Sequence, residues 1–369
     1  MNNKCTLLID GNWLLQSRFS VLGKFFKINN STHIKQTGTN ELVNMMAKSI
    51  NIMLNRFPFI DNMILVSDGG SWRKNIQKPS SRTEIEYKGN RETQEEFDWN
   101  YIWPALKILS NNFVRNDITY SCSKDIEGDD WIWYWSKKLS NTGTNCIIWS
   151  SDNDLKQLVA NNVESNAFVM WYNDKCGGFL HNSLEEKNTN DEDMLDFFLT
   201  PPTSYNPILE KVKSILKSKI SYIYPSDIIL SKVMCGDAGD NIKPAAVYVK
   251  NGRNYGLTQK MWKDISETTK ISTIQNLIGN ENLAAKYICE YKNFKKENVS
   301  KQVVLENIKY NIQLVWLDKS IIPEYCISIM DKCEYKTIDI NMVKHNYKTL
   351  CDTDKEIENI VEEIESLFD

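Results

Sequence analysis

The sequence predicts an α/β fold in which helices flank a central, mostly parallel sheet. Apolar runs of strand length occur at four places in the first half of the chain: Cys5–Ile9, Met63–Val66, Asn145–Trp149 and Phe168–Tyr172. Stretches with the apolar spacing of helices separate these runs, at Leu42–Arg56, Asn100–Leu109 and Asp129–Leu139. Strands that alternate with helices form parallel sheets with helices on both faces.

The second half of the chain reads as a mainly helical region. A polar, proline-containing stretch from about Glu185 to Ser204 indicates a junction, and helical spacing follows at Leu209–Ile220 and Pro225–Val233. We therefore expect an α/β domain over residues 1–185 and a mainly helical region over residues 186–369. The chain ends in an acidic tail, residues 352–369, with the pattern of a solvated amphipathic helix.

Composition places the chain among globular proteins and disfavours several chemistries. Of its 369 residues 41% are hydrophobic and 25% are charged, and no apolar run approaches the roughly 18 residues of a membrane-spanning helix. Its nine cysteines form no C-x-x-C pair and its three histidines are isolated, which argues against zinc sites and Ser-His-Asp catalysis. No signal-peptide pattern is visible, and we expect a cytoplasmic protein, in the host cytoplasm if its source is viral.

Carboxylates are the candidates for the chemistry. Three predicted strands are followed by an aspartate, namely Asp10, Asp68 and Asp152, and ligands of open α/β sheets bind at the carboxyl ends of strands. Each acid taken alone has a structural explanation as a turn former or a helix cap. The conjunction with other acidic clusters favours a function. These clusters contain Glu127, Asp129, Asp130, Asp154, Asp237 and Asp240.

So many carboxylates on one rim would repel one another unless cations neutralised them. Oxygen ligands without histidine or cysteine favour Mg²⁺ or Mn²⁺, which combine a few carboxylates with water and substrate phosphate. Two such ions, roughly 4 Å apart, activate water and stabilise the leaving oxygen in phosphodiester cleavage. The residues therefore predict a metal-dependent phosphodiesterase with two Mg²⁺ ions, which Mn²⁺ could replace.

A basic window follows the second strand. Between Trp72 and Arg91 six cations stand against two anions, and no apolar stripe appears until Trp99, so we expect a mobile segment. Cations neutralise phosphates and aromatic rings stack on unpaired bases. The window is therefore expected to contact a nucleic-acid strand, although a solvated basic loop would have the same pattern. The residues that we expect to take part are Trp72, Arg73, Lys74, Arg82, Tyr87, Lys88 and Arg91.

Six motifs resemble the flap endonuclease / 5′-nuclease family in order and approximate spacing: LLIDGNWLL, VSDGGSWRK, EYKGNR, IEGDDWI, SSDNDLKQLV and MCGDAGDNI. The resemblance spans about Leu7 to Ile242, and the overall layout is most similar to the T-even-phage ribonuclease H branch. It implies a PIN-like catalytic domain over residues 1–185. A basic helical arch at about 71–100 and a duplex-DNA-binding region with a helix-hairpin-helix at about 226–265 would follow.

The resemblance also implies roles for single residues. One metal would be surrounded by Asp10, Asp68, Glu127, Asp129 and Asp152, and the second served by Asp130, Asp154, Asp237 and Asp240, directly or through water. Lys88 would assist at the scissile phosphate, with Tyr87 stacking and Arg91 gripping phosphate. One departure is clear, because the glycine pair of the family's DNA-binding hairpin is missing after GDAGDNI. We therefore predict no potassium site there, and we expect duplex contacts from Lys243, Lys250, Arg253 and Lys260.

These observations lead to a functional hypothesis: a monomeric, structure-specific 5′-nuclease that removes RNA primers or 5′ flaps during phage DNA replication. Its nucleic-acid partner would be flapped, nicked or RNA-primed duplex, with ribonuclease H activity among its reactions and a single-strand-binding protein or clamp as a protein partner. Two alternatives stay open. One is a PIN-like ribonuclease acting on single strands, and the other a non-catalytic protein that binds replication forks through the basic arch.

Overall fold

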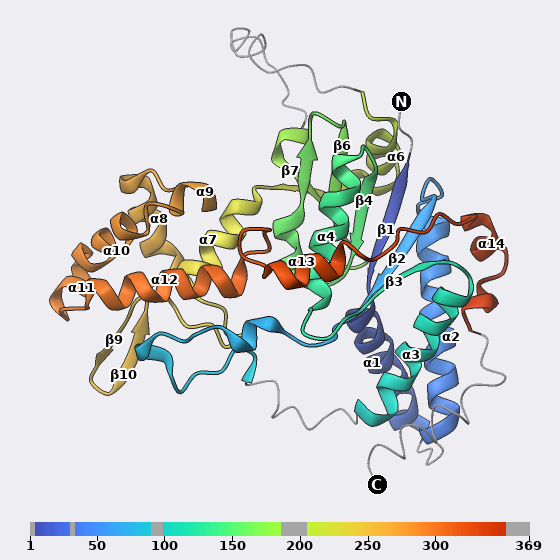
Figure 1. Cartoon of the computed structure of the whole chain (residues 1–369), viewed down its shortest axis with the longest axis horizontal. Helices are drawn as coiled ribbons and strands as arrows, with labels where there is room; N and C mark the ends of the chain where they lie inside the picture. Colours follow the sequence, from blue (N-terminus) through green and yellow to red (C-terminus); the bar gives the residue numbers. More distant parts are fainter. Residues whose placement is uncertain (1–3, 30–33, 90–98, 186–204, 352–369) are drawn as a thin grey trace. The chain divides into compact units, whose positions relative to one another are not determined.

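The computed structural model describes residues 4–29, 34–89, 99–185 and 205–351. The chain divides into two compact units. Unit 1 comprises residues 1–70, 98–223 and 324–369, and unit 2 comprises residues 71–97 and 224–323 (Figure 1). The tail at 352–369, with its expected helix, lies outside the described residues.

Unit 1 is built on a mostly parallel sheet of eight strands, as the sequence predicts. The strand order is β3-β2-β1-β4-β6-β7-β8, and β5 pairs with β6. All contacts from β3 to β6 along this order are parallel, whereas β7 runs antiparallel to β6. The strands are β1 (Cys5–Asp10), β2 (Asn62–Val66), β3 (Thr119–Ser121), β4 (Asn145–Trp149), β5 (Ala160–Asn162), β6 (Ala167–Asn173), β7 (Gly177–His181) and β8 (Ile220–Ile223).

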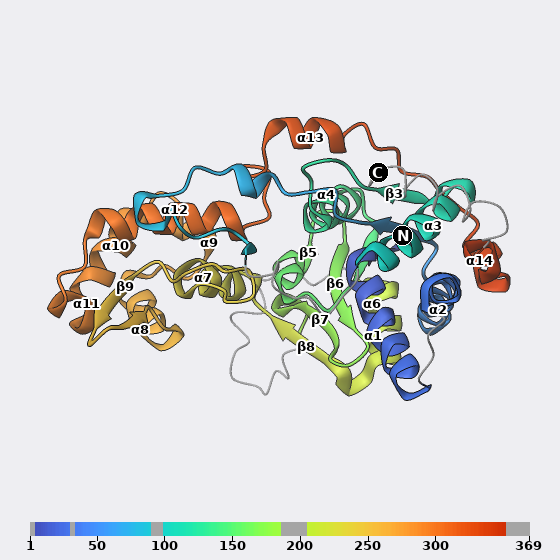
Figure 2. The same cartoon turned by 90° about the horizontal axis from the view of Figure 1, so that it is seen from below.

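Helices cover both faces of this sheet, which explains why its central strands are continuous apolar runs. Figure 2 shows α4 on one face and α1 with α6 on the other. Strands β2 and β4 are buried along their whole length. The helices of unit 1 are α1 (Gly11–Asn29), α2 (Ile34–Arg56), α3 (Trp99–Arg115), α4 (Gly128–Asn141), α6 (Pro207–Leu216), α13 (Glu324–Met330) and α14 (Ile340–His345). No helix in the described ranges is long and apolar enough to cross a membrane.

The division of the chain differs from the expected boundary near residue 185. Residues 205–223 stay with unit 1 because β8 extends the sheet by pairing with β7. The chain after 324 also returns to unit 1. There the backbone carbonyl of Lys336 accepts a hydrogen bond from Asn62 (2.8 Å), and Asp331 accepts one from the Tyr134 hydroxyl (3.0 Å). The described part of the predicted C-terminal region is therefore split, and only its central part forms a separate unit.

Unit 2 is mainly helical and has its own apolar core. Its elements are α7 (Pro225–Cys235), β9 (Val247–Lys250), β10 (Arg253–Gly256), α8 (Gln259–Thr269), α9 (Ile274–Leu277), α10 (Glu281–Glu290), α11 (Lys292–Lys296) and α12 (Lys301–Val315). The helix-hairpin-helix expected at about 226–265 takes a different form, because an antiparallel β-hairpin stands in the connection of α7 to α8. The segment between α7 and α8 is too long for a tight turn, and part of it forms the paired strands β9 and β10.

The turn from β6 to β7 generates the first prediction. Gly177 has φ +85°, and a Cβ built on it would lie 2.1 Å from the carbonyl oxygen of Lys219, next to β8. Gly279 has nearly the same φ, +84°, with nothing within 4 Å of a built Cβ. We expect Gly279→Ala to lower the free energy of unfolding by about 1–2 kcal/mol through backbone strain alone. Gly177→Ala should lower it by more than about 3 kcal/mol. Urea unfolding of both variants measures this, and equal losses would contradict it.

Candidate metal and nucleic-acid site

The three strand-end aspartates lie at one edge of the unit 1 sheet. Strands β2, β1 and β4 are neighbours and parallel, so their carboxyl ends meet at the same edge. Asp10 is the last residue of β1, and Asp68 and Asp152 follow β2 and β4 within a few residues. The negative charges of Asp68 and Asp152 both act on Asp10 and raise its pKa. The predicted convergence of these three residues is thus present in the fold.

Asp10 is held by neutral donors. One carboxylate oxygen accepts the backbone N–H of Trp13 (2.9 Å) and so caps α1, and the other accepts the Ser150 hydroxyl (2.6 Å). Burial raises the pKa of Asp10 to about 7, and these hydrogen bonds oppose that rise only in part. A buried carboxylate beside two others is the environment that a bound cation would relieve. The carboxylate oxygens at this edge therefore fit a hard divalent ion.

Asp68 is positioned by two elements. Its oxygens accept hydrogen bonds from the Asn12 side chain (2.7 Å) and from the backbone N–H of Gly128 (2.6 Å) at the start of α4. The positive end of a helix stabilises a carboxylate at this position. Asp68 is exposed. The start of α4 thereby holds Asp68 next to the acidic first turn of that helix.

That first turn presents the next acids of the predicted set. Glu127 is the N-cap of α4 and forms a capping box with Asp130, and both residues are buried. Asp129 lies beside them in the same turn and is partly exposed. On the β4 side, the Asp152 side chain accepts the backbone N–H of Asp154 (2.8 Å) and caps the 3-10 helix Asn153–Leu158. The caps identified as structural alternatives thus exist and orient the same carboxylates.

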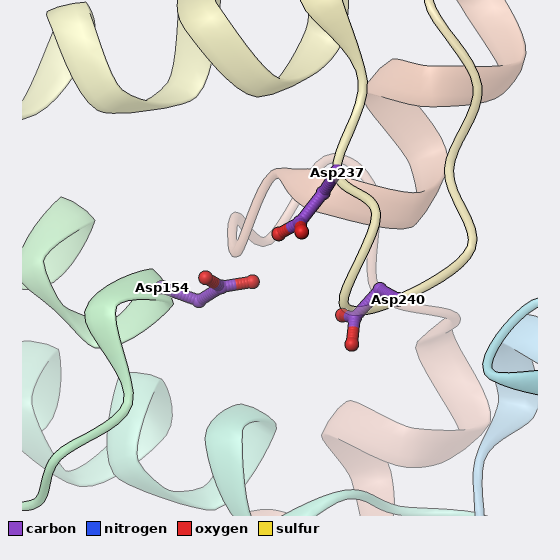
Figure 3. A group of neighbouring side chains, drawn as sticks. All are labelled: Asp154, Asp237 and Asp240. Carbon is purple, nitrogen blue, oxygen red and sulfur yellow. The ribbon is translucent and has the colours of Figure 1, made fainter. Parts of the chain in front are cut away.

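Unit 2 contributes the remaining two acids on a tight turn after α7. The backbones of Asp237 and Ile242 form a reciprocal pair of hydrogen bonds (2.8 and 2.7 Å), which closes the turn. Oxygens of Asp237 and Asp240 lie within 4.8 Å of each other. Burial would raise the pKa of Asp237, but the hydrogen bond and charge of Lys232, together with backbone hydrogen bonds from Gly239 and Asp240, leave this pKa below its usual value. Figure 3 shows the side chains of Asp237 and Asp240 on this turn.

The predicted basic arch, residues 71–100, is only partly described, and its residues 71–89 belong to unit 2. They form two short 3-10 helices, Trp72–Asn75 and Ser80–Arg82. The backbone N–H of Lys88 donates to the carbonyl of Asp240 (3.0 Å), and the Asn241 side chain donates to the carbonyl of Glu86 (2.9 Å). Residues 90–98, including Arg91, lie outside the described residues.

Arg82 explains why this segment is held so firmly. Its buried guanidinium donates to the carbonyl oxygens of Lys243 (3.1 Å) and Pro244 (2.6 Å) and to the Asn311 side chain (2.9 Å). Asn311, which is fully buried on α12, also donates to the carbonyls of Val233 (2.7 Å) and Lys243 (3.1 Å). Burial lowers the pKa of Arg82 to about 10. The pair thus ties the segment to the turn that bears Asp237 and Asp240.

Four residues expected to contact nucleic acid are buried in the structure, namely Trp72, Arg73, Arg82 and Tyr87. Arg82 and Arg73 are buried, and the Arg73 side chain donates to the carbonyl of Leu314 (3.1 Å). Tyr87 belongs to the apolar core of unit 2, with the Lys88 ammonium 4.9 Å from its ring centre. Packing inside unit 2 therefore occupies the side chains for which phosphate contact and base stacking are expected. The expected contacts that are exposed are Lys74, Lys243, Lys250, Arg253 and Lys260.

Sequence reasoning missed the residues that orient the acids and the arch. Asn12, two residues after Asp10, and Ser150, two before Asp152, both donate to carboxylates of the set. For Arg82 a signal did exist, because Asn307 and Asn311 stand four apart on the apolar stripe of α12. Buried amides need polar partners, and such a pair indicates that a polar segment packs there.

The comparisons with known proteins identify a family. Residues 5–188 match the model of the 5′-3′ exonuclease N-terminal, resolvase-like domain. The chain belongs to the flap endonuclease / 5′-3′ exonuclease family, a family of nucleases. A search of curated protein sequences finds no match.

Solved structures support the fold. A structure of the bacteriophage T5 D15 protein co-crystallised with metal ions has a TM-score of 0.50 and 14% identity, covering 94% of this chain and 100% of that chain. The T5 flap endonuclease in a pseudo-enzyme–product complex with DNA and metal ions has a TM-score of 0.50 and 16% identity, covering 95% and 100%. At this identity the likeness concerns the fold, and it extends over nearly the whole chain.

The environment of Asp10 predicts a pH-dependent stability. The pKa of Asp10 rises from 3.8 to about 7 on folding. Its contribution to the free energy of unfolding is therefore fully present below about pH 4 and is lost as the pH rises through 7. In a chelator, Asp10→Asn should become more stable than the natural chain over this range, by on the order of 4 kcal/mol at pH 8. Urea unfolding from pH 4 to 8 measures the difference, and parallel curves for the two proteins would contradict the prediction.

The burial of Arg82 gives a second prediction. Arg82→Ala would leave two carbonyls and the Asn311 amide oxygen without this donor, so we expect a loss of about 2–4 kcal/mol in the free energy of unfolding. Lys74 is exposed in the same segment, and Lys74→Ala should change this free energy by less than about 0.5 kcal/mol. Chemical unfolding of the two variants compares them, and a tolerant Arg82→Ala variant would refute the anchoring role.

Proposed function

We propose that the chain is a structure-specific 5′-nuclease that uses two Mg²⁺ ions to hydrolyse phosphodiesters of RNA primers or 5′ flaps. The observation that carries this proposal is the convergence of Asp10, Asp68 and Asp152 at one sheet edge, next to the acidic first turn of α4. Membership of the nuclease family supports it. Mn²⁺ would replace Mg²⁺ at the same oxygen ligands.

The proposed ligand set contains nine carboxylates. Asp10, Asp68, Glu127, Asp129 and Asp152 would hold the first ion, and Asp130, Asp154, Asp237 and Asp240 would serve the second. Bound divalent ions supply an activated water and stabilise the leaving oxygen. The protein itself orients the carboxylates through Asn12, Ser150 and the first turn of α4.

Lys88 would neutralise charge at the scissile phosphate. Its residue has φ +57°, an uncommon conformation for a side chain other than glycine, and its backbone N–H is bonded to the carbonyl of Asp240. The Lys88 side chain is therefore carried by the same folded unit as the Asp237–Asp240 turn. A cation held in this way stabilises phosphate charge without reorganisation during the reaction. Arg91 would add a second cation from residues that the structure does not describe.

In the cell, the proposed reaction is the removal of RNA primers or 5′ flaps during phage DNA replication, with ribonuclease H activity on the primer. The proposed substrate is flapped, nicked or RNA-primed duplex, bound by a monomer in the cytoplasm of the host. A single-strand-binding protein or a clamp would be the protein partner. Exposed Lys74, Lys243 and Lys260 support contact with phosphate, because they present positive charge on unit 2.

The test is cleavage of a 5′-labelled flap on a nicked duplex, with Mg²⁺ or with excess chelator. We expect metal-dependent cuts near the junction. Asp152→Asn should lower the rate by more than about 100-fold, because even residues that only orient metal ligands contribute about 10–100-fold. The matched control Asp117→Asn removes an exposed charge near the opposite end of the sheet and should retain activity.

Other outcomes would replace the proposal. Mononucleotide and dinucleotide products alone indicate a 5′ exonuclease. Cleavage of single-stranded RNA in preference to flapped duplex indicates the PIN-like ribonuclease. Tight fork binding that ignores both metal and Asp152→Asn, with no cleavage, indicates the non-catalytic fork binder.

A further inference from the structure

The segment that follows β4 carries two of the proposed ligands, and β6 holds it in place. This segment runs from Ser150 to Asp154, within unit 1. The indole N–H of Trp171 on β6 donates to the backbone carbonyl of Asp152 (2.9 Å). Two residues further along β6, the Asn173 side chain donates to the backbone carbonyl of Ser150 (3.1 Å). Residues two apart on a strand point to the same face, so one face of β6 supplies both donors.

The backbone of Asp152 is hydrogen-bonded through both of its polar groups. Its N–H donates to the Ser150 hydroxyl (2.9 Å), and the same hydroxyl donates to the carboxylate of Asp10 (2.6 Å). Its carbonyl accepts the indole N–H of Trp171. Side chains therefore fix the position of Asp152 relative to Asp10.

A lysine ties the following turn to the same tryptophan. Lys156 lies on the 3-10 helix Asn153–Leu158, which Asp152 caps. Its ammonium nitrogen lies 4.4 Å from the ring centre of Trp171 and 3.8 Å from that of Phe179. Phe179 is the cross-strand partner of Trp171 on β7, and the two rings pack edge to face with their centres 5.2 Å apart. Because aromatic faces attract cations, Lys156 holds the 3-10 helix on the Trp171 ring.

Burial of a tryptophan does not by itself require such a hydrogen bond. Three other buried tryptophans, Trp131, Trp133 and Trp149, have no hydrogen-bond partner for the indole N–H among the residues that the structure describes. The fold therefore tolerates a buried indole N–H without an acceptor. Apolar packing explains a large ring at Trp171, but it does not explain why the N–H of that ring meets the backbone of a proposed metal ligand.

We propose that Trp171 is a positioning residue of the nuclease site and that Lys156 supports it. The inference rests on the proposed function, because it concerns the same carboxylates. Trp171 holds the Asp152 peptide, and with it the carboxylates of Asp152 and Asp154, in the arrangement that binds divalent ions. Groups that orient metal ligands from behind contribute about 10–100-fold to metal affinity or activity.

The test measures metal binding by the full chain without nucleic acid. Mn²⁺ is the probe, and isothermal titration calorimetry gives its dissociation constant. Trp171→Phe keeps an aromatic ring for Lys156 and removes the N–H donor, so we expect the dissociation constant to rise by about 10-fold. The metal concentration that gives half-maximal flap cleavage should rise by a similar factor, and a higher metal concentration should restore most of the rate. A residue that only supported the fold would change neither metal concentration.

A matched tryptophan variant controls for loss of packing. Trp133→Phe makes the same substitution at a buried position of α4, where the indole N–H has no partner among the described residues. Its Mn²⁺ affinity should equal that of the natural chain. Thermal unfolding measures how much stability each variant has lost. An unchanged dissociation constant for Trp171→Phe overturns the proposal, and so does an equal rise for Trp133→Phe.

Substitutions of Lys156 test the proposal independently, also if Trp171→Phe does not fold. By charge alone, removing a cation two residues from Asp154 would strengthen the binding of a divalent ion. Loss of positioning acts in the opposite direction, so we expect Lys156→Met to weaken Mn²⁺ binding. Lys156→Arg keeps a cation for the two rings and should restore the natural affinity. Natural or tighter binding by Lys156→Met contradicts the supporting role, and without a folded Trp171→Phe it overturns the proposal.

Failure of this inference can be told apart from failure of the proposed function. If the natural chain binds Mn²⁺ and cuts the flap, but Trp171→Phe has the same metal dependence, the nuclease assignment stands and the positioning role is refuted. If the natural chain neither binds Mn²⁺ nor cuts with metal, the proposed function fails, and the role of Trp171 fails with it.

Discussion

The parallel sheet of unit 1 constrains where its acidic residues lie, because the carboxyl ends of its central strands meet at one edge. Neighbouring parallel strands bring Asp10, Asp68 and Asp152 together, and folding the chain therefore concentrates negative charge. The donors that hold Asp10 are neutral, a hydroxyl and a backbone amide, so they orient the carboxylate without cancelling its charge. Asp237 is different, because the ion pair with Lys232 compensates its charge within the protein. Burial raises the pKa of Asp10 above its usual value, whereas Lys232 and backbone hydrogen bonds hold the pKa of Asp237 below it.

A second constraint acts in unit 2, where a buried arginine must find acceptors. Arg82 meets it through two backbone carbonyls and the Asn311 side chain. The same carbonyls follow the Asp237–Asp240 turn in the chain, so satisfying the guanidinium also fixes where residues 71–89 lie relative to that turn. A polar network inside an apolar core is stable only when each of its polar groups has a hydrogen-bond partner. The network around Arg82 therefore fixes one arrangement of the two segments that it joins. Lys88 and the two aspartates consequently belong to one folded body.

The sheet could be predicted from sequence, whereas the packing of the basic segment could not. Alternating apolar runs identified β1, β2, β4 and β6, and the parallel topology then followed from general rules. The same rules brought the three strand-end aspartates to one edge. Strand β8 was missed because it begins where a stretch with helical spacing, Leu209–Ile220, ends. In the structure the helix α6 already ends at Leu216. Charge patterns also say nothing about burial, and so Arg73 and Arg82 read as surface cations although each is satisfied by contacts distant in sequence.

The two hairpin cations show how a local conflict in a sequence can be informative. For folding alone, an acid opposite Lys250 or Arg253 would stabilise the β9–β10 pair, yet the chain has a cation at both positions. Cations on sheet edges also prevent unwanted strand pairing, but one charge on each strand would achieve that with opposite signs as well. The two hairpin charges have the same sign, and three lysines on α11 add to it. Protection against edge pairing does not explain this. Within the described residues, no carboxylate forms an ion pair with these five cations, so their like charge is not compensated there.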